Sequence, residues 1–280
     1  MNKDKFGIFI FCWGRPNFSN TIKTLRRCGY TGDIYCLLDD LDETRFDYIK
    51  RYGKEKCFVF DKKQIASKSD PMNNFGRLDS TLFVENVMFD AAKHFGLDYF
   101  CAMCDDYTQF FHKREKERRC KRLDEVFTFF IDFLKNTPLV KCIAFAQGGD
   151  FSNIGKEMTK RKVMNSFICC TERPFVFKGA MNDDVNMYVY NGVRGALFFT
   201  YMRFMLHQPP TQIVKGGLSE TYKHFGTYVK SFYSVMLWPC AVKVCMMGQK
   251  NPRIHHVIDY NKTVPKIIDE KWKKTLINKL

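Results

Sequence analysis

Four apolar runs of strand length recur within the first 106 residues, and each one ends in a turn or in charged residues. The runs are Phe6–Trp13, Asp33–Leu38, Cys57–Phe60 and Asp98–Cys104. A short, continuous apolar run is typical of a strand that is buried on both faces of a sheet. Segments with helical spacing of apolar residues lie between these runs. Strands that alternate with helices predict an α/β fold with a mostly parallel central sheet.

The segments between these strands have recognisable ends. The expected helices are Asn17–Cys28, Asp42–Tyr52 and Asp79–Phe95. Either Asn17 or Ser19 can cap the first helix, and Gly29 closes it. Lys62–Arg77 contains Ser, Asp-Pro, Asn-Asn and Gly, a composition that predicts a loop.

The rest of the chain has a less regular pattern. Helices are expected over Glu125–Lys135, Phe225–Leu237 and the basic tail Val264–Leu280. Strands are expected over Val140–Ala146, Phe175–Lys178 and Ala241–Met247, and loops over 151–165 and Pro209–Gly217. No linker, repeat or low-complexity block separates these elements, so we expect a single domain.

Three clusters that contain arginine or aspartate residues fall at the carboxyl ends of expected strands. They are Trp13-Gly14-Arg15, Asp39-Asp40 and Asp105-Asp106. Ligands of parallel sheets bind outside the carboxyl ends of the strands, and those ends share one edge. The sequence therefore predicts a site for a charged, metal-bound ligand at this edge.

The Asp105-Asp106 pair suits a particular chemistry. A divalent cation held by oxygen ligands neutralises a pyrophosphate and stabilises it as a leaving group. A rigid strand end can fix such a ligand. The alternative interpretation of the pair is an Asp-rich turn that caps the next loop.

Two later motifs add candidates for the same chemistry. In Asn182-Asp183-Asp184 one carboxylate could accept a proton from an acceptor hydroxyl. The alternative is a turn or a helix cap. His255-His256 follows a late strand and could supply an imidazole to a metal, or be structural.

The formal net charge of +15 favours a polyanionic partner, and nucleic acid is the simplest one. Lys113–Arg122 holds seven Lys or Arg against two Glu, and Lys156–Lys162 adds four more basic residues. The first stretch can contact phosphates, or it can form the solvated face of a helix with i,i+4 pairs.

The 12 cysteines are expected to be reduced thiols in a cytoplasmic protein. Cys101 and Cys104 form the sole C-x-x-C, and without a second pair they predict buried strand thiols, as do Cys169 and Cys170. No secretory signal is recognisable, and no run reaches the roughly 20 apolar residues that span a bilayer. We therefore expect no membrane partner.

The order of these elements resembles that of GT-A glycosyltransferases, a Rossmann-like fold. Their first strand leads into an Arg-containing loop and a helix, which is similar to GIFIFCWGRPNFSNTIKTL. Their D-x-D motif corresponds to Cys104-Asp105-Asp106-Tyr107, and their later acidic pair to NDDVNM. More narrowly, the set resembles the phage-associated, TET-associated glycosyltransferase-like enzymes that modify hydroxymethylated pyrimidines in DNA. The resemblance covers most of the chain.

The resemblance implies a role for each motif. It assigns donor binding to Trp13, Arg15, Asp39, Asp40, Arg77 and Asp105, and metal binding to Asp106, His255 and His256. It assigns catalysis to Asp184 or Asp183, and DNA contacts to Lys113, Arg114, Arg118, Arg119, Lys121 and Arg122. Cys104 departs from the motif at its first position, and Cys is a poor ligand for magnesium or manganese. Asp106 is therefore the expected direct ligand.

The implied activity is metal-dependent transfer of a glucose- or arabinose-type sugar from a nucleotide sugar, such as a UDP-sugar, onto hydroxymethylcytosine in double-stranded DNA. The cofactor would be Mn²⁺ or Mg²⁺ and the protein a monomer, with 1–110 binding the donor and 111–280 the acceptor. Three alternatives remain at this point: a protein or glycan acceptor, a nucleic-acid-binding module without catalysis, and a nucleotidyltransferase. The last would show a glycine-rich phosphate loop, of which Trp13-Gly14-Arg15-Pro16 is a poor example.

Overall fold

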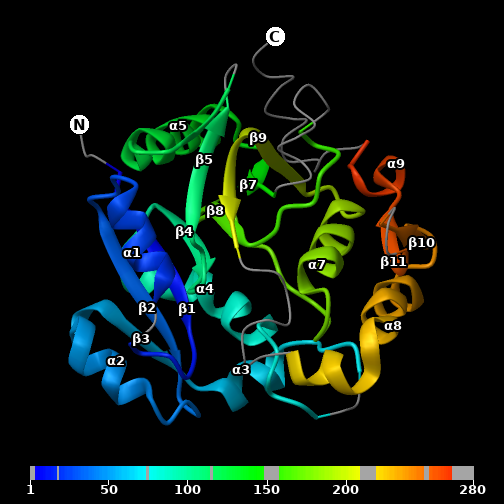
Figure 1. Cartoon of the computed structure of the whole chain (residues 1–280), viewed down its shortest axis with the longest axis horizontal. Coiled ribbons are helices and arrows are strands. Elements are labelled where there is room, and N and C mark those ends of the chain that lie inside the picture. Colours follow the sequence, from blue (N-terminus) through cyan, green and yellow to red (C-terminus); the bar gives the residue numbers. More distant parts are fainter. Residues whose placement is uncertain are drawn as a thin grey trace.

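The structure is a computed structural model that describes residues 4–17, 19–73, 76–113, 116–147, 158–208, 219–248 and 252–266. Within these residues a central sheet is covered by helices on both faces (Figure 1). The sheet strands are β1 Phe6–Cys12, β2 Asp33–Asp39, β3 Cys57–Phe60, β4 Tyr99–Cys104, β5 Gln109–Lys113, β6 Glu117–Arg119, β7 Val140–Ala146, β8 Ser166–Cys170 and β9 Leu197–His207.

Strand direction places the carboxyl ends of most strands at one edge of the sheet. The spatial order is β3-β2-β1-β4-β8-β7-β9-β5-β6. β3, β2, β1 and β4 are mutually parallel, whereas β8 and β5 each run antiparallel to both of their neighbours. Since β7 and β9 pair in parallel, all the described sheet strands except β8 and β5 point the same way. The predicted mostly parallel α/β sheet is confirmed.

Helices surround this sheet, and a separate hairpin lies beyond it (Figure 1). The helices are α1 Asn20–Arg27, α2 Arg45–Tyr52, the 3-10 turn η1 Lys54–Lys56, α3 Lys62–Lys68, α4 Leu82–His94, α5 Leu123–Asn136, α7 Asp183–Gly192, α8 Ser219–Leu237 and α9 Tyr260–Thr263. The hairpin pairs β10 Val242–Met247 with β11 Arg253–Ile258, and α8 packs against it.

Two apolar layers form because neighbouring strand residues point to opposite faces of the sheet. Phe9 packs in the layer that α4 and α7 cover, whereas its neighbour Ile10 packs in the layer under α1, α2 and α5. Both side chains are fully buried. This explains why the strands appear in the sequence as continuous apolar runs.

Several expected elements differ from the structure. Lys62–Lys68 is a helix within the expected loop, because the Asp61 side chain accepts a hydrogen bond from the Gln64 N–H and caps it. Phe175–Lys178 is not a strand: the Asn86 side chain bonds both the N–H and the carbonyl of Phe177, as a neighbouring strand would.

The basic stretch 113–122 is not a helix either. Its described residues form the end of β5, strand β6 and the loop that leads to α5, so the helix-face interpretation is wrong. Val264–Lys266, at the start of the expected C-terminal helix, is not helical, and 267–280 lie outside the described residues, as do 148–157 and Pro209–Leu218. All 12 cysteines are free thiols, and Cys101, Cys169 and Cys170 are buried as predicted, whereas Cys104 is half-buried.

Candidate functional site

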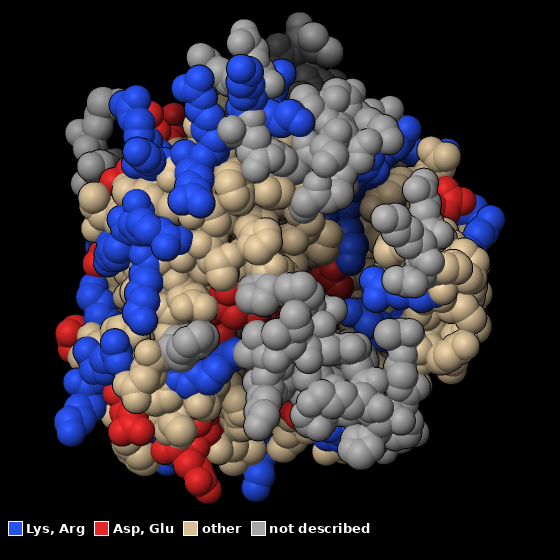
Figure 2. Space-filling view, in the orientation of Figure 1, with Lys and Arg blue, Asp and Glu red and all other residues tan. Residues whose placement is uncertain are grey.

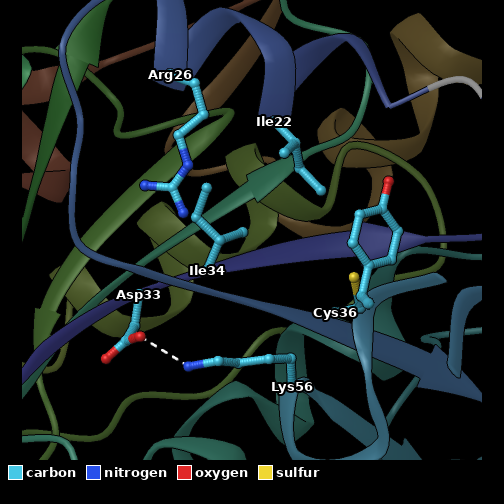
Figure 3. A pocket seen from close by; sticks show the side chains of 7 residues that line it. Ile22, Arg26, Asp33, Ile34, Cys36 and Lys56 are labelled. Atoms are coloured by element: carbon cyan, nitrogen blue, oxygen red, sulfur yellow. Dashed lines mark hydrogen bonds and ion pairs between the residues drawn. The ribbon is translucent and has the colours of Figure 1, made fainter.

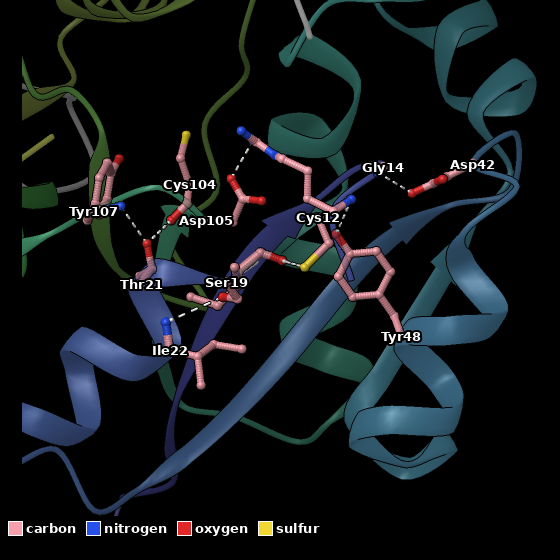
Figure 4. A network of polar contacts seen from close by, with 12 residues as sticks. Cys12, Gly14, Ser19, Thr21, Ile22, Asp42, Tyr48, Cys104, Asp105 and Tyr107 are labelled. Atoms are coloured by element: carbon pink, nitrogen blue, oxygen red, sulfur yellow. Dashed lines mark hydrogen bonds and ion pairs between the residues drawn. The ribbon is translucent and has the colours of Figure 1, made fainter. Parts of the chain in front are cut away.

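The turn after β4 is anchored to the first helix of the chain. The Thr21 hydroxyl donates to the Cys104 carbonyl at 2.7 Å and accepts the Tyr107 N–H at 2.9 Å, and the Thr21 N–H bonds the Asp105 carbonyl (Figure 4). Ser19 caps α1 at this point by accepting the Ile22 N–H. Both acidic side chains of the turn are thus held on a rigid strand end.

Arg15 and Asp105 form an ion pair between the loops after β1 and β4. The Arg15 guanidinium lies 2.6 Å from Oδ1 of Asp105, whose side chain is almost completely buried. Burial raises the pKa of Asp105 to about 6, a shift that Arg15 opposes and Asp106 reinforces. Burial also raises the pKa of Asp106. Oδ2 of Asp105 is buried and has no hydrogen-bond partner among the described residues, which leaves one carboxylate oxygen for a ligand.

The loop that carries Arg15 is fixed by one side chain from the loop between β2 and α2 and by another from α2. The Asp42 carboxylate accepts the Gly14 N–H at 2.9 Å, and the Tyr48 hydroxyl accepts the Arg15 N–H at 3.0 Å (Figure 4). Gly14 has a φ of +65°, a left-handed conformation that glycine adopts without strain. Neither Asp42 nor Tyr48 belongs to a sequence motif that would have predicted its support of this loop.

Asp39 is buried at the end of β2, and its partner is a lysine that the sequence analysis missed. The Lys62 ammonium pairs with one carboxylate oxygen of Asp39 and lies 4.4 Å from the centre of the Trp13 ring. Burial raises the pKa of Asp39 despite the opposing effect of Lys62. Trp13 is 45% exposed, so its ring offers a face for stacking. Lys62 lies just after β3. The rule that ligands bind outside the carboxyl ends of parallel strands could therefore have identified it from the sequence.

Two of the predicted donor-binding residues have partners within the protein. Asp40 accepts the Lys62 N–H at 2.8 Å and so supports the start of α3. Arg77 is exposed and pairs with Asp79 two residues away. Neither is brought into contact with the Arg15–Asp105 pair.

The acidic pair at the start of α7 forms a second cluster. Asp183 accepts a hydrogen bond from the Thr81 hydroxyl, and Asp184 forms an ion pair with Lys162. Burial acts to raise the pKa of Asp184, but Lys162 and other cations outweigh it and the net shift is downward. Asp184 is therefore ionised at neutral pH, whereas burial and its neighbour Asp184 raise the pKa of Asp183.

Glu85 lies beneath this pair on the buried side of α4. Its side chain is 5% exposed, and one of its oxygens has no hydrogen-bond partner among the described residues. Burial, followed by the charge of Asp183, raises its pKa well above the usual value. The signal in the sequence is a glutamate on the apolar face of an amphipathic helix, where a charged residue is rare unless it is paired.

The two histidines lie with the second cluster. The nearest charged groups to His256 include Lys162, Asp184 and Lys230. Nδ1 of His255 lies 2.8 Å from the carbonyl of His256, so that nitrogen is already engaged.

The predicted three-ligand metal site is not formed. Within the described ranges, no group of three or more His, Cys, Asp or Glu side chains is arranged to hold a metal ion, so Asp106, His255 and His256 do not meet. The histidines stand on β11, in the hairpin that packs against α8, and the charged groups around His256 include Lys162, Asp184 and Lys230. Asp106 stays with Asp105 at the end of β4.

The burial of His256 gives a pH-dependent prediction. Its side chain is 8% exposed, and burial, with the positive charge of Lys162, lowers its pKa from 6.5 to about 4. As the pH falls through this window, the unfolded chain binds a proton that the folded chain does not, so the stability of the folded state decreases. At pH 5 this effect amounts to about 2 kcal/mol. Urea unfolding at pH 7 and pH 5 should therefore show a smaller acid destabilisation for His256→Gln than for the unmodified chain. An identical pH dependence in both proteins would contradict the burial of a neutral imidazole.

Basic side chains dominate the rim of the site. Figure 2 shows Lys and Arg over the left and upper parts of this face, where Figure 1 has α1 and the β5–β6 end of the sheet. Asp and Glu side chains appear in the recessed centre. Of the predicted DNA contacts, Arg118, Arg119, Lys121 and Arg122 are exposed and Lys113 is half-buried, whereas Arg114 lies outside the described residues. Arg122 pairs with Glu125.

One small pocket lies away from all these residues. It has a volume of about 190 Å³ and opens at the start of β2, between α1 and α2 (Figure 3). Ile22, Ile34 and Cys36 line it, and an Asp33–Lys56 ion pair crosses its rim. Because Asp33 and Ile34 stand at the amino end of β2, this pocket is at the opposite edge of the sheet from Asp39 and Asp105.

The mostly parallel α/β sheet carries carboxylates at the ends of β2 and β4, and α7 carries a second acidic pair, which is the arrangement that the sequence predicted. The profile of the TET-associated glycosyltransferase family matches residues 6–217. The chain belongs to this family of glycosyltransferases, which confirms the resemblance seen in the sequence. Comparison with curated proteins gave no match.

Solved structures with a similar arrangement have very different sequences. Glucosyl-3-phosphoglycerate synthase from Mycobacterium tuberculosis, in complex with Mn²⁺, UDP and phosphoglyceric acid, has a TM-score of 0.45 and 9% identity over 94% of this chain and 88% of its own. TarS 1–349 from S. aureus has a TM-score of 0.40 and 12% identity over 72% of this chain and 59% of its own. Among the described helices, none combines the length and apolar character needed to cross a bilayer.

Proposed function

We propose that this glycosyltransferase moves a sugar from a nucleoside diphosphate sugar, such as a UDP-sugar, onto the hydroxymethyl group of a modified cytosine in double-stranded DNA. The main support for the donor is the Arg15–Asp105 pair at the end of β4, with Asp106 beside it and a buried Asp105 oxygen that has no hydrogen-bond partner among the described residues. The Lys and Arg side chains at the rim of the site, together with the net positive charge, support DNA as the acceptor (Figure 2).

The residues at this strand end fit a divalent cation. Two adjacent carboxylates with raised pKa values are costly to ionise together unless a positive charge compensates them. The buried, unpartnered Oδ2 of Asp105 is an oxygen ligand of the type that Mg²⁺ and Mn²⁺ prefer. Asp106 and Asp105 would hold the ion, which when bound neutralises the donor diphosphate. The histidines are not part of this proposal.

The remaining residues at the carboxyl-end edge of the sheet bind and orient the donor. The exposed face of Trp13 stacks on the planar nucleobase, and Lys62 holds the indole from its other face. Arg15, fixed through its backbone by Tyr48, keeps Asp105 in place. The acidic pair on α7 receives the acceptor hydroxyl, and one of the two carboxylates takes its proton.

The β5–β6 hairpin supplies phosphate contacts for DNA. Replacing both Arg118 and Arg119 with Glu is expected to raise the Kd for duplex DNA at least tenfold, because each arginine that neutralises a phosphate adds favourable counterion release. The slope of log K against log salt should fall by about 1.8 for two lost contacts. Fluorescence anisotropy over a salt series measures both quantities. Lys93→Glu on α4, an exposed lysine away from the hairpin, is the matched control.

In the central test, the protein is incubated with hydroxymethylcytosine duplex DNA, Mn²⁺ and a panel of nucleotide sugars. The DNA is then digested, and the masses of the nucleosides are measured by mass spectrometry. A mass gain of one sugar on hydroxymethylcytosine is the expected result, and it should disappear when unmodified cytosine DNA is used. Donor hydrolysis without transfer would refute the DNA acceptor while keeping the glycosyltransferase class. DNA binding with neither hydrolysis nor transfer would favour a binding module.

A further inference from the structure

Helix α4 is joined by hydrogen bonds to the segment that leads into α7. At the start of α4 the Ser80 hydroxyl donates to the Ala180 carbonyl at 2.9 Å. Further along the helix, the Asn86 side chain bonds both the N–H and the carbonyl of Phe177. Residues of α4 and α7 also pack in the same apolar layer of the sheet. These contacts fix which side chains of α4 face Asp183.

Two α4 side chains, Thr81 and Glu85, reach the first carboxylate of α7. They are four residues apart, so they lie on the same face of the helix. The Thr81 hydroxyl donates to Oδ2 of Asp183, and the Glu85 carboxyl forms a side-chain hydrogen bond with the same residue. The N–H of Asp184 donates to Oδ1 of Asp183 at 3.0 Å. Three groups therefore compete for the lone pairs of this one carboxylate.

A hydrogen bond between two carboxyl groups needs a proton, because an ionised carboxylate only accepts. Glu85 is 5% exposed, and burial, followed by the charge of Asp183, raises its pKa well above the usual value. Burial raises the pKa of Asp183 too, but the Thr81 and Asp184 donors oppose that shift. The second Glu85 oxygen is buried without a hydrogen-bond partner among the described residues, which costs a neutral acid far less than a carboxylate. Glu85 therefore holds the proton.

Asp184 is held in a different way from Asp183. Its Oδ2 pairs with the Lys162 ammonium, which helps to keep the carboxylate ionised, and its side chain is 19% exposed. A third negative charge, on Glu85, would raise the pKa of both aspartates and favour a protonated Asp184. A neutral Glu85 avoids this repulsion. Asp183 is thus occupied by donors from α4, whereas Asp184 remains an ionised base.

We propose that Glu85 is a positioning residue for sugar transfer: its protonated carboxyl donates to Asp183 and thereby leaves Asp184 to take the proton of the acceptor hydroxyl. This inference rests on the proposed function. The acceptor oxygen bonds the anomeric carbon, and the bond from that carbon to the diphosphate oxygen breaks, with its electron pair staying on that oxygen. The acceptor proton passes to Asp184. Glu85 acts through Asp183 and touches neither substrate.

The first experiment locates the proton without any ligand. Infrared difference spectroscopy at pH 7 compares the full chain with Glu85→Gln. The unmodified chain should show the C=O stretching band of a protonated carboxyl group, and the variant should lack it. This measurement does not depend on the acceptor. A spectrum of the unmodified chain without such a band would overturn the inference, even if the chain transfers sugar to DNA.

The second experiment compares kcat for two substitutions of Glu85. Glu85→Gln keeps a neutral group with an N–H donor and should retain most of the rate. Glu85→Met fills the space without a donor and should lower kcat about tenfold, because Asp183 loses a hydrogen bond to its charged form. The KM for the donor should stay the same. An unchanged Tm for Glu85→Met separates this effect from lost packing, and Asp90→Asn on the exposed side of α4 is the control.

The pH dependence of kcat provides a readout that a packing role would not change. As the pH rises through the raised pKa of Glu85, the unmodified chain loses the donor and gains a charge beside Asp183, so kcat should fall. Glu85→Gln cannot ionise and should keep its rate to higher pH. The other ionisable groups that face Glu85 are Asp183 and Asp184 of α7 and Cys104 of β4, and both proteins contain them.

The outcomes separate this inference from the proposed function. Equal rates for the unmodified chain, Glu85→Gln and Glu85→Met would overturn the inference. A loss in Glu85→Gln as large as that in Glu85→Met would also overturn it, because an ionised Glu85 would then be required. Donor hydrolysis is measured beside DNA transfer, since water then replaces the acceptor hydroxyl. Hydrolysis without DNA transfer, with the same order of rates among the variants, would support the role of Glu85 and refute the proposed acceptor.

Discussion

Asp106→Asn is expected to lower kcat for sugar transfer by about 10³-fold, equivalent to about 4 kcal/mol of transition-state stabilisation. The substitution keeps the shape of the side chain but removes the charge that binds a divalent cation. The turn should stay folded, because Thr21 anchors it through the backbone of Cys104, Asp105 and Tyr107 rather than through the Asp106 side chain.

The measurement is single-turnover transfer to hydroxymethylcytosine DNA, followed by mass spectrometry of the nucleosides. Calorimetry with UDP should show that Mn²⁺ no longer strengthens binding in the variant. Asp90→Asn, an exposed carboxylate on α4, is the control and should leave both quantities unchanged. Full turnover by Asp106→Asn would remove this residue from the donor site and with it the proposed cation.

Asp184→Asn is expected to lower kcat by about 10²- to 10⁴-fold, the usual contribution of a positioned proton acceptor. The KM for the donor should change much less, because the Trp13 and Arg15 loop does not depend on α7. Asp184 is ionised at neutral pH through its pairing with Lys162, so its carboxylate can accept a hydrogen bond from the acceptor hydroxyl.

The substitution also leaves the Lys162 ammonium without its partner, which costs stability in a half-buried position. The double variant Asp184→Asn with Lys162→Gln removes this unpaired charge and should recover stability but not kcat. Asp183→Asn provides the comparison within the pair. If Asp184→Asn retains the turnover of the unmodified chain while Asp183→Asn loses it, the proton acceptor is Asp183.

Substitutions in the DNA contacts should change DNA binding, whereas substitutions of the catalytic residues should change the rate of the chemical step. Arg118 and Arg119 lie on a hairpin at the far edge of the sheet, so their loss should weaken DNA binding and leave donor hydrolysis unchanged. The catalytic variants should show the opposite pattern. The two sets of measurements together separate the donor site, the acceptor rim and the α7 carboxylates.

The sequence by itself determined the sheet and its functional edge. The apolar runs at β1, β2 and β4 are long enough and uniform enough to indicate burial on both faces, which predicts parallel strands. The shorter run at β3 forms an edge strand that is only partly buried. Parallel strands place the residues after β1, β2 and β4 at one edge, and Arg15 and Asp105 do form an ion pair there. The order of these motifs also sufficed for the family, which the match over residues 6–217 confirms.

Only the tertiary structure decided which polar groups face each other. Lys62 pairs with Asp39 from 23 positions away, and Lys162, Asp184, Lys230 and His256 converge from a loop and from α7, α8 and β11. No local periodicity encodes such contacts, because they depend on how α7, α8 and β11 pack after the sheet has formed. For the same reason the sequence grouped His255 and His256 with Asp106, whereas the fold surrounds the histidines with lysines. Packing therefore determined the charge around the histidines, which the residue types alone did not.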